Sequence, residues 1–260
     1  MFRWDIFFQF LLSPSSAIFF VQGAWNTLWI SIVAQFFGVV IGLLLALMRL
    51  STFPSRKFPA LAGLARAYIW FFRGSPLLVQ VLLLFDGLPR IFPGLPLLPD
   101  WACVVLAFSL NEGAYMAEIV RAGISSVDTG QMEASKALGM RYSLAMRRII
   151  LPQAARVIIP PLGNEFNNML KTTSIASVIG ILDLTYTAET FGSPTFTIFE
   201  LLVVATLYYL LLTTLWDLVQ SQIEKRLDPN RDIKVEINPK SLGGRIFGFG
   251  FNRSGQFGVR

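Results

Sequence analysis

The chain has 260 residues, of which 54% are hydrophobic and 15% are charged, and its formal net charge is +6. Soluble domains carry about 25% charged residues, so this composition, with its apolar residues gathered in long runs, indicates a membrane protein. The absence of histidine and the single cysteine, Cys103, exclude a Ser-His-Asp triad, a histidine-bound metal or haem and an intrachain disulfide. The sequence therefore lacks the commonest general base and the commonest metal ligand of proteins, and we expect no metal site on this chain.

Five segments are predicted to cross the membrane, giving an all-α integral membrane protein. The first belongs to a run without charged residues from Trp25 to Met48, long enough for a hydrocarbon core of about 30 Å. The second contains Arg73, Gly74 and Pro76, and we expect a break there, because proline removes an i→i−4 hydrogen bond. Spans two to four carry charges, proline or glycine, so partly re-entrant segments are an alternative for them. In chain order the spans are Asn26–Met48, Tyr68–Leu88, Trp101–Val120, Val157–Ile181 and Phe199–Val219.

Two glycines in the first span are spaced for helix packing. Gly38 and Gly42 form a small-xxx-small pair, which allows two helix backbones to approach closely in a membrane. A chance spacing in a glycine-containing helix is the alternative. We expect this face to contact another span.

Basic residues alternate between the loops. The loops after spans one and three hold most of the lysines and arginines, the loop after span two has Arg90, and the loop after span four has none. Because basic loops remain in the cytoplasm, we expect an external N-terminus and a cytoplasmic C-terminus in a bacterial inner membrane.

The most polar of these cytoplasmic segments is Glu133–Pro152, EASKALGMRYSLAMRRIILP. It reads as two short helices separated by Gly139, because glycine tolerates the left-handed conformation that ends a helix. Asp128 is expected in the first turn of the first helix, where its charge suits the helix dipole, and Pro152 is expected to break the second helix. The sequence pattern leaves open a structural loop whose positive face lies against anionic lipid.

This segment resembles the "EAA" loop of permease subunits of ATP-binding-cassette (ABC) importers. The matching residues are Glu133, Ala134, Gly139, Ile149, Leu151 and Pro152, and Ser135 replaces the usual second alanine. The flanking stretches FFRGSPLLVQVLLLF, SLNEGAYMAEIVRAGI and GNEFNNMLKTTSIASVIG resemble the polar amino-acid branch of that family. The resemblance covers roughly Trp25 to Lys225 and does not indicate which amino acid is carried.

The resemblance implies a five-helix type I importer core that works as a homodimer or heterodimer. It implies two separate cytoplasmic ATPase subunits, which hold ATP and Mg²⁺, and an extracytoplasmic substrate-binding protein. The sequence contains no G-x-x-x-x-G-K-[ST] phosphate loop, as expected if ATP binds to separate subunits. This subunit is therefore expected to be non-catalytic. The division expected is an extracytoplasmic segment 1–24, a transmembrane domain 25–225 with a coupling loop at about 128–152, and a disordered cytoplasmic tail 226–260.

The loop is expected to act as a coupling helix in a groove of the ATPase. Glu133 would supply a polar contact there, and Gly139 would permit the turn. Arg147 and Arg148 are expected to pair either with acidic groups of the ATPase or with lipid phosphates. The coupling residues expected are Glu133, Ala134, Gly139, Arg147, Arg148, Leu151 and Pro152.

Polar residues inside the predicted spans are candidates for the translocation pathway, because charges in a membrane are costly. Asn164, Glu165, Asn167 and Asn168 form a polar cluster that would receive an ammonium group; a structural network, such as Glu165 or Glu112 with Arg73, is the alternative. Near the cytoplasmic end, Glu118 lines the path or pairs with Arg121. The pathway or gate residues expected are Arg73, Ser75, Pro76, Asn111, Glu112, Asn164, Glu165, Lys171 and Thr172.

Other hypotheses use the same charges. Glu165 and Lys171 would serve a coupling ion in a secondary transporter that needs no ATPase, although five spans without an inverted repeat argue against it. A membrane enzyme would use Glu112 and Glu118 as acid and base, and the lack of histidine weakens that reading. Outside the membrane, Asp86 is a candidate contact for the binding protein.

Overall fold

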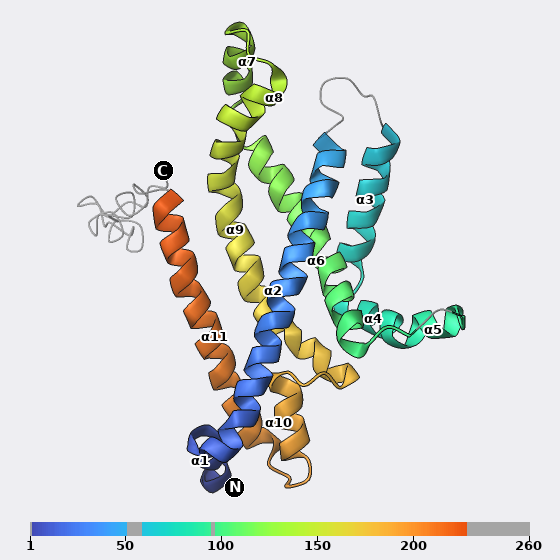
Figure 1. The fold of residues 1–260 in the computed structure, drawn as a ribbon, viewed down its shortest axis with the longest axis vertical. Coiled ribbons are helices and arrows are strands. Elements are labelled where there is room, and N and C mark those ends of the chain that lie inside the picture. Colours follow the sequence, from blue (N-terminus) through green and yellow to red (C-terminus); the bar gives the residue numbers. More distant parts are fainter. Residues whose placement is uncertain (1, 51–58, 95–96, 228–260) are drawn as a thin grey trace, which may run out of the picture.

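The computed structural model describes residues 2–50, 59–94 and 97–227, which form a tall bundle of helices without strands in these ranges (Figure 1). Most of the predicted C-terminal tail lies outside the described residues. The helical elements are α1 (Trp4–Leu12), α2 (Pro14–Leu50), α3 (Pro59–Gly74), α4 (Leu77–Leu82), the π-helical turn η1 (Leu83–Gly87), α5 (Leu88–Ile91), α6 (Asp100–Ser125), α7 (Thr129–Ala137), α8 (Tyr142–Ala145), the π-helical turn η2 (Met146–Ile150), α9 (Leu151–Thr172), the 3₁₀ segment η3 (Thr173–Ile179), α10 (Leu184–Gly192) and α11 (Ile198–Leu227).

Three helices of the described ranges, α2, α6 and α11, are long and apolar enough to cross a membrane. They confirm predicted spans one, three and five, but with longer helices, since α2 begins at Pro14 rather than Asn26 and α11 continues to Leu227. The exposed large apolar side chains of α2 and α11, such as Phe36 and Leu218, point away from the bundle. A multi-pass membrane protein follows from these helices.

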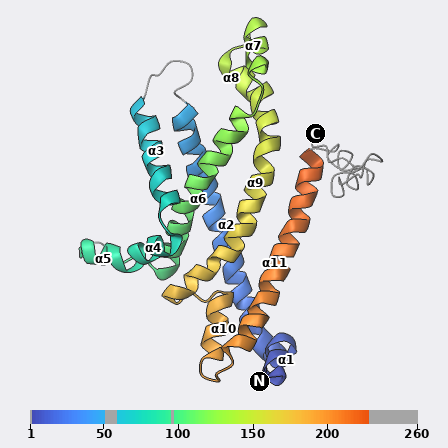
Figure 2. The ribbon, with the colours of Figure 1, turned by 180° about the vertical axis from the view of Figure 1, so that it is seen from behind.

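The second predicted span is not one straight helix. It begins at Pro59, ends at Gly74, and the following limb Leu77–Ile91 is bent from it by 103°. Both views show this limb running sideways from the bundle (Figures 1 and 2). The helix before the break begins at Pro59 rather than at Tyr68, and the break itself falls where the sequence predicted it, at Arg73-Gly74-Ser75-Pro76. The physical reason is that Pro76 cannot donate the next helical hydrogen bond and its ring excludes the preceding turn.

The fourth predicted span is α9, which starts at Leu151 instead of Val157 and contains Pro160 and Pro161 within it. Its charges and prolines lower its apolar character, which explains why hydropathy alone gives a weak signal there. The helix then tightens into η3, and Gly180 ends it in the left-handed conformation, with φ +79°. The views place α9 between α6 and α11 (Figures 1 and 2).

The centre of the fold is the close packing of α2 on α6. A Cβ atom built on Gly38 would collide with the Glu112 side chain, and one on Gly42 would collide with Met116. Gly38 and Gly42 therefore lie on the face of α2 that touches α6. Around this contact lie buried side chains of the central core, including Ile30, Val104 and Phe108.

The N-terminal end of the bundle is tied together by short elements. The side chains of Phe7, Phe20, Leu184 and Leu201 form a second core among α1, α2, α10 and α11. Asp183, which follows the fourth span and lies outside the membrane-spanning helices, accepts a hydrogen bond from the Tyr186 backbone N–H at 2.7 Å and so caps α10. This end lies opposite the α7–α8 hairpin (Figure 1).

Candidate functional site

The predicted hairpin is present and projects beyond the spans at one end of the molecule (Figure 1). Helix α7 ends in a Schellman motif, in which Met140 N–H binds Ser135 C=O at 3.0 Å and Gly139 N–H binds Lys136 C=O at 2.9 Å. Gly139 has φ +74°, which favours glycine. Asp128 is the N-cap residue rather than a first-turn residue, and its carboxylate accepts the Gly130 N–H at 2.6 Å.

The hairpin presents side chains outward that have no role in its own fold. Leu138 is 81% exposed, and Glu133, Ala134, Arg147 and Arg148 are exposed as well. Ser135 points inward instead, donating to Gln131 C=O at 2.6 Å, and is 1% exposed. Only a small side chain fits at this buried position, and the serine hydroxyl has an acceptor there, so serine can replace alanine. The outward residues form an apolar and charged surface suited to a protein groove.

Proline 152 does not break the helix, contrary to the sequence-based prediction. The chain stays helical from Tyr142 through η2 into α9, and Leu151 and Pro152 occupy the first turn of α9. A proline is tolerated in a first turn, and the wider π-helical turn immediately before it accommodates the lost N–H and the ring. The hairpin is therefore joined to α9 by continuous helix.

A network of amides holds the broken second span. Pro76 has no N–H to give to the Phe72 carbonyl, which lies four residues earlier. Asn111 of α6 donates to that carbonyl at 2.8 Å, and Gln80 of α4 donates to it at 3.0 Å. Gln80 also contacts the Ser75 hydroxyl oxygen at 2.9 Å. Asn111 and Ser75 are thus brought together, with a structural task at the bend.

Arg73, next to this bend, lies over the Tyr115 ring, 5.1 Å from its centroid. In the part of the chain that the structure describes, its guanidinium forms this cation–π contact and no ion pair with Glu112 or Glu165. The predicted structural pairing of Arg73 with these carboxylates is therefore wrong for this conformation. The aromatic ring offers Arg73 a partner on a neighbouring helix.

Glu112 and Glu118, the acid and base of the enzyme hypothesis, both lie on α6 and have different surroundings. Glu118 forms ion pairs with Arg49 and, at 3.0 Å, with Arg121 near the end of α6, which confirms the predicted Arg121 pair. Glu112 is 5% exposed, lies against Gly38 and is close enough to Glu165 for the two charges to interact. The two glutamates do not form one acid–base pair.

Polar residues of α9 face α11. Asn164 accepts a hydrogen bond from Gln220 at 3.1 Å, and Asn167 donates to Asp217 at 2.5 Å. The Trp216 ring N–H donates to Gly163 C=O at 2.8 Å. These bonds join α9 and α11 near the two prolines of α9. Asn164 consequently has an interhelical partner, separate from Glu165 on the α6 side.

The other two pathway candidates of this region lie further along α9. Lys171 is exposed, and the Thr172 hydroxyl donates to Asn168 C=O at 2.8 Å within the helix. The structure does not bring Lys171 and Glu165 together as a pair among the described residues.

Sequence reasoning missed several uncharged polar residues. Gln80 is buried and donates to the Phe72 carbonyl, which Pro76 leaves without its helical donor. Gln220 is buried and donates to the Pro160 carbonyl, and Gln35 is buried next to Glu112. The available signal for Gln35 was its spacing, because Thr27, Ser31 and Gln35 recur every four residues on one face of an apolar helix.

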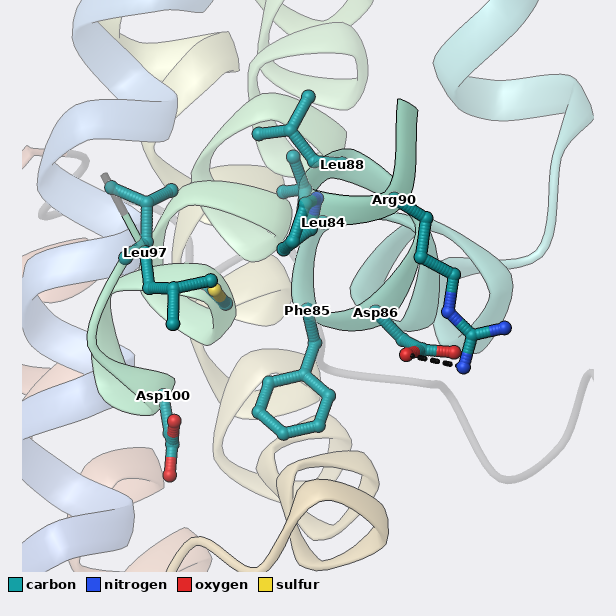
Figure 3. Close-up of a pocket in the computed structure, with 10 residues that line it drawn as sticks. Leu84, Phe85, Asp86, Leu88, Arg90, Leu97 and Asp100 are labelled. Atoms are coloured by element: carbon teal, nitrogen blue, oxygen red, sulfur yellow. Dashed lines mark ion pairs between the residues drawn. The ribbon is translucent and has the colours of Figure 1, made fainter. Parts of the chain in front are cut away.

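A pocket of about 390 Å³ lies between the sideways limb and the first turns of α6 (Figure 3). Its wall is mostly apolar, and the Asp86 carboxylate within it pairs with Arg90 at 2.8 Å. None of the expected pathway residues lines this pocket, so it is separate from the polar groups of the bundle. The residues lining it are Leu84, Phe85, Asp86, Leu88, Pro89, Arg90, Leu97, Leu98, Asp100 and Cys103.

Membrane-crossing helices that bury polar groups between them define a multi-pass membrane protein, here with a helical hairpin that projects from one end. The model of the family described as the inner membrane component of binding-protein-dependent transport systems matches residues 38–229. The chain belongs to this family.

Proteins that are similar in sequence and in structure support the same family. The chain is 38% identical over 241 residues to the arginine transport system permease protein of Corynebacterium glutamicum, covering 86% of this chain and 72% of the relative. It is 39% identical over 209 residues to the probable glutamine ABC transporter permease protein of Bacillus subtilis, covering 80% and 93%.

Among solved structures, a crystal structure of an amino acid ABC transporter with histidines matches with a TM-score of 0.76 and 40% identity, covering 84% of this chain and 98% of that chain. An inward-facing methionine ABC transporter matches with a TM-score of 0.66 at 21% identity, covering 83% and 99%, and supports the fold. The type I ABC permease fold predicted from the sequence is confirmed.

Proposed function

We propose that this chain is the membrane-spanning permease subunit of an ATP-driven, binding-protein-dependent amino-acid importer. The observation that carries the proposal is the projecting hairpin with exposed Glu133, Leu138 and Gly139, in a chain whose family and relatives are transport permeases. The comparisons favour this function over an ion-coupled secondary transporter. The subunit itself is non-catalytic, and ATP and Mg²⁺ bind to a separate ATPase.

The hairpin is the contact for the ATPase. Its coupling residues are Glu133, Ala134, Gly139, Arg147 and Arg148 at the exposed end, with Leu151 and Pro152 in the following turn. An exposed leucine beside charged groups offers the mixed surface that a groove on a soluble protein accepts. Movement of the groove on ATP binding would displace the hairpin and tilt the spans between outward and inward access.

The remaining partners are assigned to the two ends of the bundle. The hairpin faces the cytoplasm, and the N-terminus, at the opposite end of the bundle, faces outward, where a substrate-binding protein docks. Two permease subunits form the pathway together, with their exposed apolar helix faces shared between the second subunit and lipid. The substrate is an amino acid, and the polar groups of α6 and α9 line its path.

Co-purification tests the coupling assignment. The unaltered chain and a Glu133→Lys/Gly139→Asp double variant are each co-expressed with the ATPases of the same cell, solubilised in mild detergent and purified. Glu189→Lys is the matched control, because Glu189 is exposed on α10 at the other end. We expect the double variant alone to lose the ATPase. Absence of an ATPase from the unaltered chain, or equal retention by the double variant, would contradict the assignment.

A further inference from the structure

The first helix, α1, stops one residue before the first span begins. Ser13 between them has an extended backbone, with φ −78° and ψ 123°, and Pro14 opens α2. A proline disfavours the helical conformation of the residue before it and is tolerated in a first turn, so the two helices do not merge into one. Both views show α1 folded beside the start of α2, at the end of the bundle opposite the hairpin (Figures 1 and 2).

One side of α1 is apolar and exposed. At about 100° per residue, positions 4, 8 and 12 lie within about 80° of one another on the helix surface. Trp4, Phe8 and Leu12 occupy these positions and are 61%, 49% and 69% exposed. We call these three residues the apolar stripe. Large apolar side chains gathered on one exposed face indicate a surface that another partner covers.

The two other sides of α1 face the bundle and water. Phe7 is buried in the second core, and the Phe10 ring packs against Phe20, with 6.1 Å between the ring centroids. Asp5 and Gln9 are exposed polar residues on the opposite side of the helix. The apolar stripe lies between these two sides. A helix with a polar side next to an exposed apolar one is suited to the boundary between water and lipid.

Contacts with α11 place α1 at the level where that span begins. The Arg3 backbone N–H donates to Glu200 Oε1 at 2.8 Å, and the Arg3 side chain pairs with Asp5 at 2.9 Å. Glu200 is the last charged residue before an uncharged stretch of α11 that continues to Trp216. Because charged side chains are costly within the hydrocarbon core, this group of charges marks the edge of the bilayer. Helix α1 therefore starts at the membrane boundary.

The apolar stripe is continuous with the exposed apolar side of α11. The centroid of the Phe2 ring lies 4.6 Å from that of Trp4 and 5.9 Å from that of Phe199, which is 68% exposed. The exposed apolar side chains that follow Phe199 on α11 include Leu202, Leu207 and Leu210. Just before α11, Phe196 is 95% exposed and has φ +53°, a conformation that bulky residues rarely adopt. Exposed aromatic rings thus gather at this end of α11.

We propose that α1 is an interfacial helix whose apolar stripe is buried in the lipid bilayer, at the end of the spans opposite the hairpin. Lipid is the partner because the stripe joins the exposed apolar side of a span at the membrane boundary, and because tryptophan, phenylalanine and leucine are the side chains that such helices bury. The opposite charges of Arg3 and Asp5 cancel, so the stripe binds the apolar part of the bilayer and needs no anionic headgroup. The helix fixes the depth of α2 and α11 in the membrane, whatever substrate is carried.

Spin labelling measures the depth of α1 in the full-length chain, reconstituted into neutral phosphatidylcholine vesicles. The single cysteine is removed by Cys103→Ala, and Phe8→Cys then carries a nitroxide on the apolar stripe. Gln9→Cys is the matched control, because Gln9 is the next residue and is exposed on the polar side. Relaxation of each label by molecular oxygen, which concentrates in hydrocarbon, is compared with relaxation by a water-soluble nickel chelate. We expect the label at position 8 to favour oxygen and to lie about 5–10 Å below the phosphates, and the label at position 9 to favour the chelate.

Two results would overturn the proposal. Equal access of the nickel chelate to both labels would show that the apolar stripe faces water. Shielding of position 8 from both reagents would show that a second copy of the chain or another protein covers the stripe in place of lipid. If Phe8→Cys does not give a monodisperse protein, Leu12→Cys tests the same stripe, with the same expected order against position 9.

Discussion

The side-chain amide of Asn111 donates a hydrogen bond to the backbone carbonyl of Phe72 at 2.8 Å, across the interface of α6 and α3. In a regular helix this carbonyl would pair with the N–H of residue 76, which is a proline. A residue far along the chain thus replaces a donor that the local sequence removed. The bend of 103° is therefore a tertiary feature, fixed by α6 and by Gln80.

Replacing Asn111 by leucine should destabilise the bend. The Phe72 carbonyl would keep Gln80 alone of its two side-chain donors, and we expect a loss of about 0.5–2 kcal/mol in the free energy of unfolding. Denaturant titration in detergent micelles measures it. A double-mutant cycle with Gln80→Leu should show coupling between the two positions; strictly additive losses would mean that they do not share the carbonyl.

Replacing Gly42 by alanine should loosen the contact of α2 with α6. The new Cβ atom would overlap Met116, and relief of such overlap costs typically 1–3 kcal/mol. Gly63→Ala is the control, because nothing lies within 4 Å of a Cβ atom at that helical position. We expect the control to be neutral or stabilising by up to about 1 kcal/mol. Equal melting temperatures of the two variants would contradict the close approach.

Substitution of Gly139 should separate backbone strain from surface fit. Gly139 has φ +74°, and no atom of this subunit lies within 4 Å of a Cβ atom built on it. Alanine should therefore strain the turn by about 1 kcal/mol without causing a clash in this subunit, whereas asparagine tolerates the left-handed conformation. Gly139→Asp should leave membrane insertion intact and uncouple transport from ATP hydrolysis. The measurement is ATP hydrolysed per amino acid imported.

For Gly139→Asn the outcome depends on which property matters. A variant that couples normally would show that the turn geometry is sufficient, whereas a defect equal to that of Gly139→Asp would show that the groove excludes any side chain. Normal transport by Gly139→Asp would contradict the coupling-loop assignment.

Asp183 should make the stability of the end of the bundle formed by α1, α10 and the N-terminal part of α2 depend on pH. Burial raises the pKa of its carboxyl to about 6, against 3.8 for an ordinary aspartate, although bonds from Tyr186 and Tyr209 oppose the rise. Because the folded pKa is the higher one, the stabilisation by the bound proton is full below about pH 4 and is lost as the pH rises through 6. The shift corresponds to roughly 2–3 kcal/mol.

The check is the difference in melting temperature between the unaltered chain and Asp183→Asn at pH 4.5 to 7.5. Asparagine keeps the acceptor for the Tyr186 N–H and does not titrate. As the pH rises, the melting temperature of Asp183→Asn should therefore increase relative to that of the unaltered chain. A difference that is constant over this range would show that Asp183 does not titrate there.

The sequence predicts the parts of this fold that depend on local chemistry. Apolar runs locate α2, α6 and α11, Arg73 to Pro76 locates a break, and Gly139 locates the hairpin turn. These signals depend on hydropathy, proline and glycine, which act within a few residues.

What the sequence could not supply depends on neighbours in space. The angle of the bend needs Asn111, the continuous helix at Pro152 needs a π-helical turn, and Arg73 has an aromatic partner in place of the expected carboxylate. Gln35 escaped notice because one amide in an apolar run has little weight until an acid from another span lies beside it.

The unbroken path from Tyr142 to Thr172 has a mechanical consequence. At about 1.5 Å per residue this helical path is roughly 45 Å long, with one end in the hairpin and the other at the start of η3. Had Pro152 formed a flexible joint, a push on the hairpin would have been absorbed there. Because the helix is continuous at Pro152, a displacement of the hairpin is expected to be carried into α9 at least as far as Pro160 and Pro161, where each proline removes a helical hydrogen bond.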